Sequence, residues 1–137
     1  MSLIRVDEVR TALVTAVLVN ATITAQLNDA LEVREHNWKG TGFSYPNIRV
    51  EITRVPPDPN RNCGQSFIGS IYVYSEEASS TQADRIAGII ADEYDDKSIS
   101  SNGIFFTNIS VVPVGAIAES ELVWRSEVQV ESMIQRV

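Results

Sequence analysis

The sequence predicts one α+β domain over residues 1–137, with an antiparallel four-stranded sheet and helices packed on one face. Two stretches repeat apolar residues at helical spacing, and several others alternate apolar and polar residues as half-buried strands do. These elements follow one another in the order α-β-β-α-β-β. A chain of 137 residues, 44% of them hydrophobic, can bury a core without disulfides or structural metal.

The first helix is expected from Leu3 to Val19, where apolar residues recur every three or four positions. Asp7 and Glu8 place negative charge in its first turn, where the helix dipole favours it. The next segment, Ala21–Leu31, begins with strand-like alternation but also suits a short helix, so a second helix and an irregular packing arm both stay open. Glycines and a proline mark His36–Pro46 as a loop.

Two strands are expected next, at Ile48–Thr53 and at Phe67–Ser75, because apolar and polar residues alternate along both. Between them, Pro56–Gly64 contains three prolines, which cannot donate hydrogen bonds to a sheet. The pattern therefore predicts an antiparallel hairpin with a long, stiff tip.

A second helix is expected to begin with Ser79 and Gln82, which have the spacing of a capping box. It ends near Lys97, before a loop at Ser98–Gly103. Two closing strands are expected at Ile104–Val112 and Leu122–Met133. The residues that these periodicities place in the core are Leu13, Val17, Ile48, Val50, Ile52, Ile71, Val73, Ile86, Ile90, Trp124 and Val128.

The net charge of −7 argues against two classes of partner. Proteins that grip nucleic acid or an anionic membrane over a broad surface need clustered lysine and arginine, and here the basic residues are scattered. The single Cys63 offers no internal disulfide, and the sequence has no evident leader, lipidation motif or membrane span. We expect a protein made in a cytoplasm that does not bind a membrane.

Catalytic and metal sites are not expected. His36 has no second histidine to share a metal, and Cys63 lies in the proline-rich tip without an orienting partner. The acidic run of Asp92, Glu93 and Asp96 would place Asp92 and Asp96 on one helix face, where carboxylates can bind Mg²⁺. A solvated helix end is the preferred interpretation. The alternative is a small α+β enzyme or ligand-binding protein that uses this acidic helix end.

The order of elements resembles a known family. Tyr45-Pro46-Asn47-Ile48 leads into a strand, and Ile71-Tyr72-Val73-Tyr74-Ser75 precedes a serine-started helix that contains Ala83, Ile86, Ala87 and Ile90. With the helix before them and the two strands after them, these elements resemble the tail terminator, or tail completion (neck), proteins of tailed bacteriophages. The resemblance covers about Leu3 to Met133, and the long proline-rich tip departs from it. A monomeric regulatory module would explain neither that tip nor the long last strand.

The resemblance implies a structural virion protein that is not an enzyme and needs no cofactor. Such a protein forms a homo-oligomeric, hexameric ring at the head-proximal end of the tail, ends growth of the tail tube and joins the tail to a head–tail connector or stopper protein. It is assembled in the host cytoplasm, and the genomic DNA passes through the ring without specific binding. An acidic ring suits a conduit that must not hold its cargo.

The proline-rich tip is the candidate assembly contact. Asp58, Asn60, Arg61 and Asn62 supply polar groups there, and a stiff backbone loses less entropy when a partner orders it. Because the tip lies beyond both strands of its hairpin, we expect the sheet to form without it.

Overall fold

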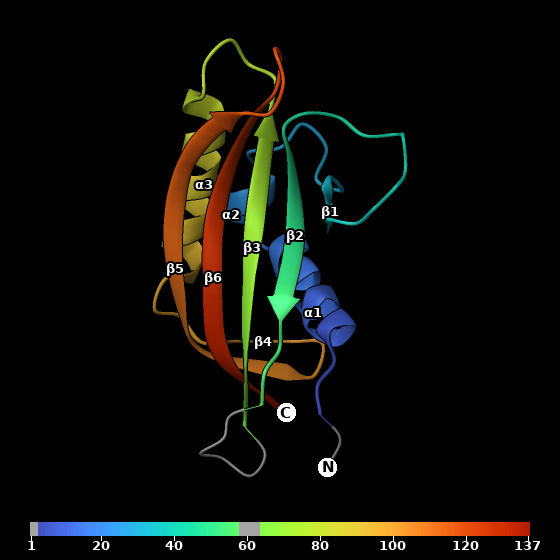
Figure 1. The fold of residues 1–137 in the computed structure, drawn as a ribbon, viewed down its shortest axis with the longest axis vertical. Helices are drawn as coiled ribbons and strands as arrows, with labels where there is room; N and C mark the ends of the chain where they lie inside the picture. Colours follow the sequence, from blue (N-terminus) through green and yellow to red (C-terminus); the bar gives the residue numbers. More distant parts are fainter. Residues whose placement is uncertain (1–2, 58–63) are drawn as a thin grey trace.

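Alternating side chains build the centre of the sheet from two long strands, β3 (Gln65–Ser75) and β6 (Trp124–Arg136). In this computed structural model, which describes residues 3–57 and 64–137, the two strands pair antiparallel from Gln65–Ile134 to Ser75–Trp124. β2 (Asn47–Arg54) pairs with β3, and β5 (Ile104–Ala118) pairs with β6. The result is a strongly curved sheet that resembles half of a barrel (Figure 1).

Two short strands complete the sheet and make the predicted fold class wrong. β1 (Val33–Glu35) runs parallel to β2, and β4 (Ile99–Ser101) pairs with β5, so the order is β1-β2-β3-β6-β5-β4. The sheet is thus six-stranded and mixed, not four-stranded and antiparallel. Three residues are too few to show alternation, and β4 falls in the segment that we expected to be a loop.

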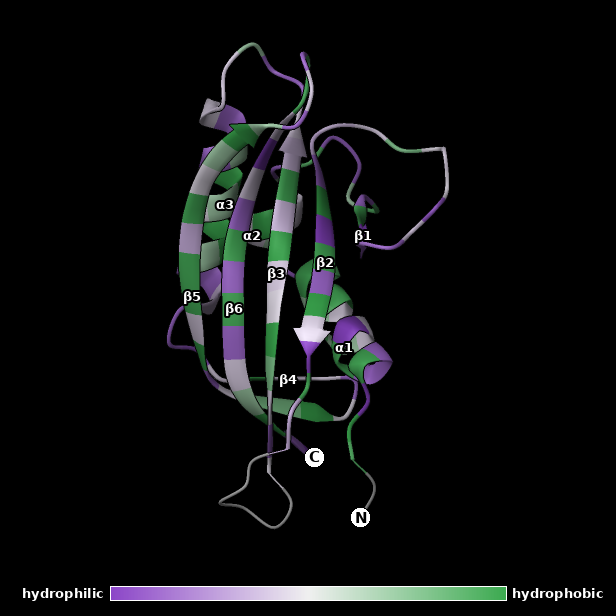
Figure 2. Cartoon of the chain, viewed as in Figure 1, coloured by the Kyte–Doolittle hydropathy of each residue, from purple (hydrophilic) through white to green (hydrophobic). Residues whose placement is uncertain are grey.

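Three helices lie behind the sheet in Figure 1: α1 (Val6–Leu18), α2 (Ala21–Thr24) and α3 (Thr81–Tyr94). α1 packs on β1 and β2, and α3 packs on β3, β5 and β6. Along the long strands, hydrophobic and hydrophilic residues alternate, as Figure 2 shows. Within the described residues, every helix is too short or too polar to cross a membrane.

The helix boundaries show where local sequence rules applied. The backbone N–H of Arg5 donates to the Glu8 carboxylate (2.8 Å) at the start of α1. The open segment after α1 contains the short α2, whose Ile23 N–H donates to the Asn20 side chain. The expected capping box at the start of α3 does not form. Gln82 instead accepts a hydrogen bond from the Ser75 hydroxyl (2.6 Å) and so ties α3 to the end of β3.

The predicted core is confirmed with one exception. Every residue of that set is buried apart from Trp124, which is half-buried because it begins β6 at the end of the sheet. The largest fully buried side chains are Phe67 and Phe106, whose rings meet edge to face with centroids 5.5 Å apart. Two residues further along β3, Gly69 allows a close approach to β2, since a Cβ there would lie 2.5 Å from the Glu51 carbonyl oxygen.

The outer edge of β5 is partly closed where β4 does not cover it. The N–H and carbonyl of Ile109 bond to the backbone of residues 96–97, both at 2.8 Å. Pro113 has no N–H to offer, and the N–H of Ala116 donates to the Asp84 carboxylate on α3 (3.0 Å). These three positions therefore offer no free N–H to another strand.

We predict a large difference between two aromatic truncations. Phe67→Ala should lower the free energy of unfolding by about 3–5 kcal/mol, because it opens a cavity beside Phe106. Trp124→Ala should cost clearly less, since its ring keeps contact with water. Urea denaturation of both variants measures this, and an equal loss would show that Trp124 belongs to the core.

A second prediction concerns alkaline pH. Burial raises the pKa of Tyr94 to about 12, well above the ordinary value near 10. Because the raised pKa favours the neutral phenol in the folded state, its contribution is complete below about pH 10 and is lost as the pH rises towards 12. Tyr94→Phe should therefore flatten the loss of stability between pH 10 and 12, measured by thermal melts. An unchanged profile would contradict this assignment.

Candidate functional site

The outer face of β2, which the alternating pattern assigns to solvent, is covered at one end. Asn47 and Arg49 alternate to the outer side of the sheet, yet both are buried, with Arg49 only 8% exposed. The loop of residues 36–46 folds back over them, and the Asn47 amide donates to the Ser44 carbonyl (3.1 Å). Both faces of β2 are therefore packed at this end.

A buried carboxylate anchors this loop. Glu32, which is 1% exposed, lies 3.2 Å from the Arg34 guanidinium and 3.9 Å from that of Arg49, and it accepts the N–H of Ser44. Arg49 also donates to the carbonyls of Glu32 and Ile48 (3.1 and 2.9 Å). Burial lowers the pKa of Arg49 from its ordinary value, and the Glu32 carboxylate opposes that shift. The pairing makes two buried charges tolerable.

Trp38 lies between the two arginines and the remaining rings of the loop. The guanidinium carbon of Arg34 is 3.7 Å from its ring centroid, and that of Arg49 is 5.5 Å away. Phe43 stands edge-on to both Trp38 and Tyr45. Only glycine fits at position 40, because a Cβ would fall 1.9 Å from the Trp38 ring.

These side chains enclose a cavity of about 200 Å³, which we call the aromatic pocket. Phe43 is 46% exposed at its mouth. The remaining lining comes from the end of β1, the loop and the strands β2 and β3: His36, Trp38, Gly40, Tyr45, Asn47, Arg49 and Tyr74. Such a pocket offers ring faces and positive charge together, which suits an apolar ring beside an acidic group.

His36 has a structural partner. Its Nδ1 lies 3.3 Å from the Glu51 carboxylate, and its ring packs 5.1 Å from that of Tyr72. Tyr72 donates to the same carboxylate (3.3 Å). The neighbouring hydroxyl of Ser70 donates to Glu127 (2.7 Å).

A shallow groove of about 440 Å³ continues from there across the outer face of β2, β3, β6 and β5. Its charged side chains are Glu51, Glu127 and Glu131. This groove is therefore acidic.

The acidic end of α3 does not form a site. The helix ends at Tyr94, and Asp96 lies beyond it with φ of +61°. The expectation that Asp92 and Asp96 share one helix face is therefore wrong. Asp92 and Asp96 are exposed to solvent. Across residues 3–57 and 64–137, no three His, Cys, Asp or Glu side chains gather as metal ligands.

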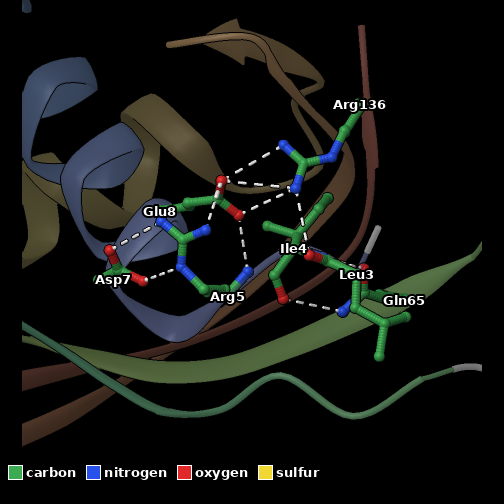
Figure 3. Close-up of polar contacts among 7 residues, drawn as sticks. All are labelled: Leu3, Ile4, Arg5, Asp7, Glu8, Gln65 and Arg136. Atoms are coloured by element: carbon green, nitrogen blue, oxygen red, sulfur yellow. Dashed lines mark hydrogen bonds and ion pairs between the residues drawn. The ribbon is translucent and has the colours of Figure 1, made fainter. Parts of the chain in front are cut away.

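The predicted assembly contacts Asp58, Asn60, Arg61 and Asn62, and the cysteine Cys63, lie outside the described residues. Gln65, which begins β3 just after the proline-rich tip, is held by hydrogen bonds to the start of the chain (Figure 3). The Gln65 side-chain amide bonds to both the N–H and the carbonyl of Ile4 (2.7 and 3.1 Å).

At the far end of β6, Arg136 lies 3.1 Å from the Glu8 carboxylate and donates to the Leu3 carbonyl (3.1 Å). We call these contacts of Gln65 and Arg136 the terminal clamp. It joins the start of the chain, the root of the tip and the last strand.

Comparisons with known proteins agree on the fold. No protein-family model and no curated protein matches this sequence. Among solved structures, the chain is similar to one from the "Virion of native gene transfer agent (GTA) particle", with a TM-score of 0.71 and 12% identity over 92% of this chain and 93% of that one. A second solved chain, which carries no functional name, has a TM-score of 0.61 and 14% identity over 96% and 94%. At such low identity the likeness establishes the shared fold.

We predict that the buried carboxylate holds the aromatic pocket together. Glu32→Ala should lower the free energy of unfolding by about 3–5 kcal/mol, because it leaves the buried Arg49 without its counter-charge. As the control, Glu119→Ala removes a partner of Arg125 (3.5 Å) at the surface and should cost less than about 1 kcal/mol. Chemical denaturation of both variants gives the comparison. Equal costs would show that Arg49 does not depend on Glu32.

Proposed function

We propose that this chain is a structural virion protein that forms a hexameric ring at the head-proximal end of a phage tail. There it ends growth of the tail tube and joins the tail to a connector or stopper protein, after assembly in the host cytoplasm. The observation that carries the proposal is the fold likeness to a chain of a gene transfer agent virion, which extends over more than nine-tenths of both chains. The resemblance of the element order to tail terminators supports the specific position.

The charge of the molecule supports a role as a DNA conduit. The chain carries a net charge of −7, and Glu51, Glu127 and Glu131 make the groove across the outer face of the sheet acidic. If this face lines the hole of the ring, it repels phosphates, and DNA passes without being held.

Exposed apolar side chains on β5 supply a surface for assembly. Val112, Val114 and Ile117 are 54%, 39% and 50% exposed. The pairing of β5 with β6 places all three beside the outward-facing Gln129, Glu127 and Arg125. Apolar groups gathered on one strand commonly mark a protein contact. We assign them to contacts with neighbouring subunits or with the tail tube, and the polar residues of the proline-rich tip to a further assembly contact.

The proposed role is structural, and the acidic end of α3 does not form the site that the enzyme alternative requires. That alternative needed Asp92, Glu93 and Asp96 to converge on a cavity. Two of the three are exposed, and the helix that was to align them stops too early.

The oligomeric state tests the ring. Native mass spectrometry of the purified chain, alone and with isolated tail tubes, should show a species of six times 15.1 kDa, and electron microscopy should show a ring or a capped tube. The variant Asp92→Asn/Glu93→Gln/Asp96→Asn should assemble like the unmodified chain. A chain that stays monomeric with tubes present, or a tube that keeps growing, would overturn the proposal.

A further inference from the structure

We infer that the proline-rich segment 56–59 of one copy docks in the aromatic pocket of a neighbouring copy. The inference rests on the proposed ring, for which it names the contact between subunits. Its first support is the placement of the two parts on β2. The pocket surrounds Asn47 and Arg49 at the start of that strand, and Pro56 follows its end at Arg54.

A chain cannot fill its own pocket with this segment. The 8 residues of β2 separate the two by about 26 Å at about 3.3 Å per residue, and the chain leaves the strand in the opposite direction (Figure 1). Pocket and segment can therefore meet only between copies.

The chemistry of the pocket fits the segment. Aromatic-lined grooves bind proline-rich segments, whose extended conformation is largely set before binding. The rings of Trp38, Phe43 and Tyr74 face a cavity of about 200 Å³. That volume is smaller than the roughly 300–1,000 Å³ typical of sites for drug-sized ligands, so it suits side chains better than a cofactor.

The charge of Asp58 distinguishes this segment from a proline-rich segment without a charged side chain. The sequence is Pro-Pro-Asp-Pro, with Asp58 between two prolines. Arg34 and Arg49 both lie against the Trp38 ring, and their two positive charges exceed the single negative charge of Glu32 beside them. A carboxylate carried between prolines can meet a guanidinium while the prolines contact the rings.

The root of the segment is fixed in advance. The Pro56 carbonyl accepts the N–H of Ser66 (3.1 Å), and Pro57 forms a bridge with Gln65, which the terminal clamp holds against Ile4. A fixed root reduces the entropy lost on docking. Because the donor and acceptor surfaces are different, copies that dock one after another are joined head to tail, and such contacts close a ring when the rotation between copies allows it.

Disulfide crosslinking of the full chain tests the inference, using the native Cys63 near the segment. Gly42→Cys places a thiol beside Phe43 at the pocket mouth, where an added Cβ meets no other atom within 4 Å. Gly88→Cys is the matched control, a half-exposed position on α3, outside the proposed contacts, where an added Cβ also meets no other atom within 4 Å. Under mild oxidation, Gly42→Cys should give a ladder of covalent oligomers on a denaturing gel, whereas Gly88→Cys should give monomer.

Two further variants assign the crosslink. Gly42→Cys/Cys63→Ser should give no ladder, and adding Pro57→Ser/Pro59→Ser to Gly42→Cys should lower the crosslinked fraction several-fold. Rings in native mass spectra without a disulfide between Cys63 and the thiol introduced at position 42, or an equal ladder from Gly88→Cys, would overturn the docking and leave the ring proposal standing. A ladder without rings would support the docking and overturn the ring. Neither rings nor a ladder would overturn both.

Discussion

The inner face of β3 and β6 must be kept from water, and the rest of the molecule is arranged around that requirement. Phe67, Ile71 and Val128 are fully buried there, at positions that strict alternation assigns to one side of the sheet. The sheet curves so that α1 and α3 can cover this side together. The terminal clamp then fixes α1 to both central strands through Glu8, Arg136 and Gln65.

β2 differs from the other strands because its outer face is also covered, and this covering forms the candidate site. A strand with one wet face would leave Arg49 in solvent, but here the loop of residues 36–46 covers it. Covering a charge requires a counter-charge, which Glu32 supplies from the turn before β1. The aromatic pocket is thus the product of a buried ion pair and of a loop rich in rings.

Much of the fold could be predicted from the sequence, because long periodic segments report burial directly. α1, α3 and the four longer strands were expected near their observed positions, and only Trp124 among the expected core residues is not buried. The short strands could not be found by periodicity. β4 nevertheless had an overlooked indication, since Asn102-Gly103 is a strong hairpin turn and both residues have positive φ.

The aromatic pocket could not be predicted from the sequence pattern around each of its residues. Arg49 occupies a position that alternation assigns to solvent, and nothing near it in the sequence shows that a loop returns over it. Glu32 is separated from Arg49 by 17 positions, so their pairing depends on β1 lying parallel to β2. A parallel neighbour is a long-range property that a short apolar run does not reveal.

The partly closed edge of β5 limits how copies of this chain can add to one another. An open sheet edge lets identical chains add strands to one another without limit, which leads to fibres. Here Pro113, the Asp84 carboxylate and the backbone of residues 96–97 occupy or remove donors along that edge. Copies that accumulate in a cell are thereby hindered from polymerising through their backbones, so side chains remain to decide when and with whom they associate.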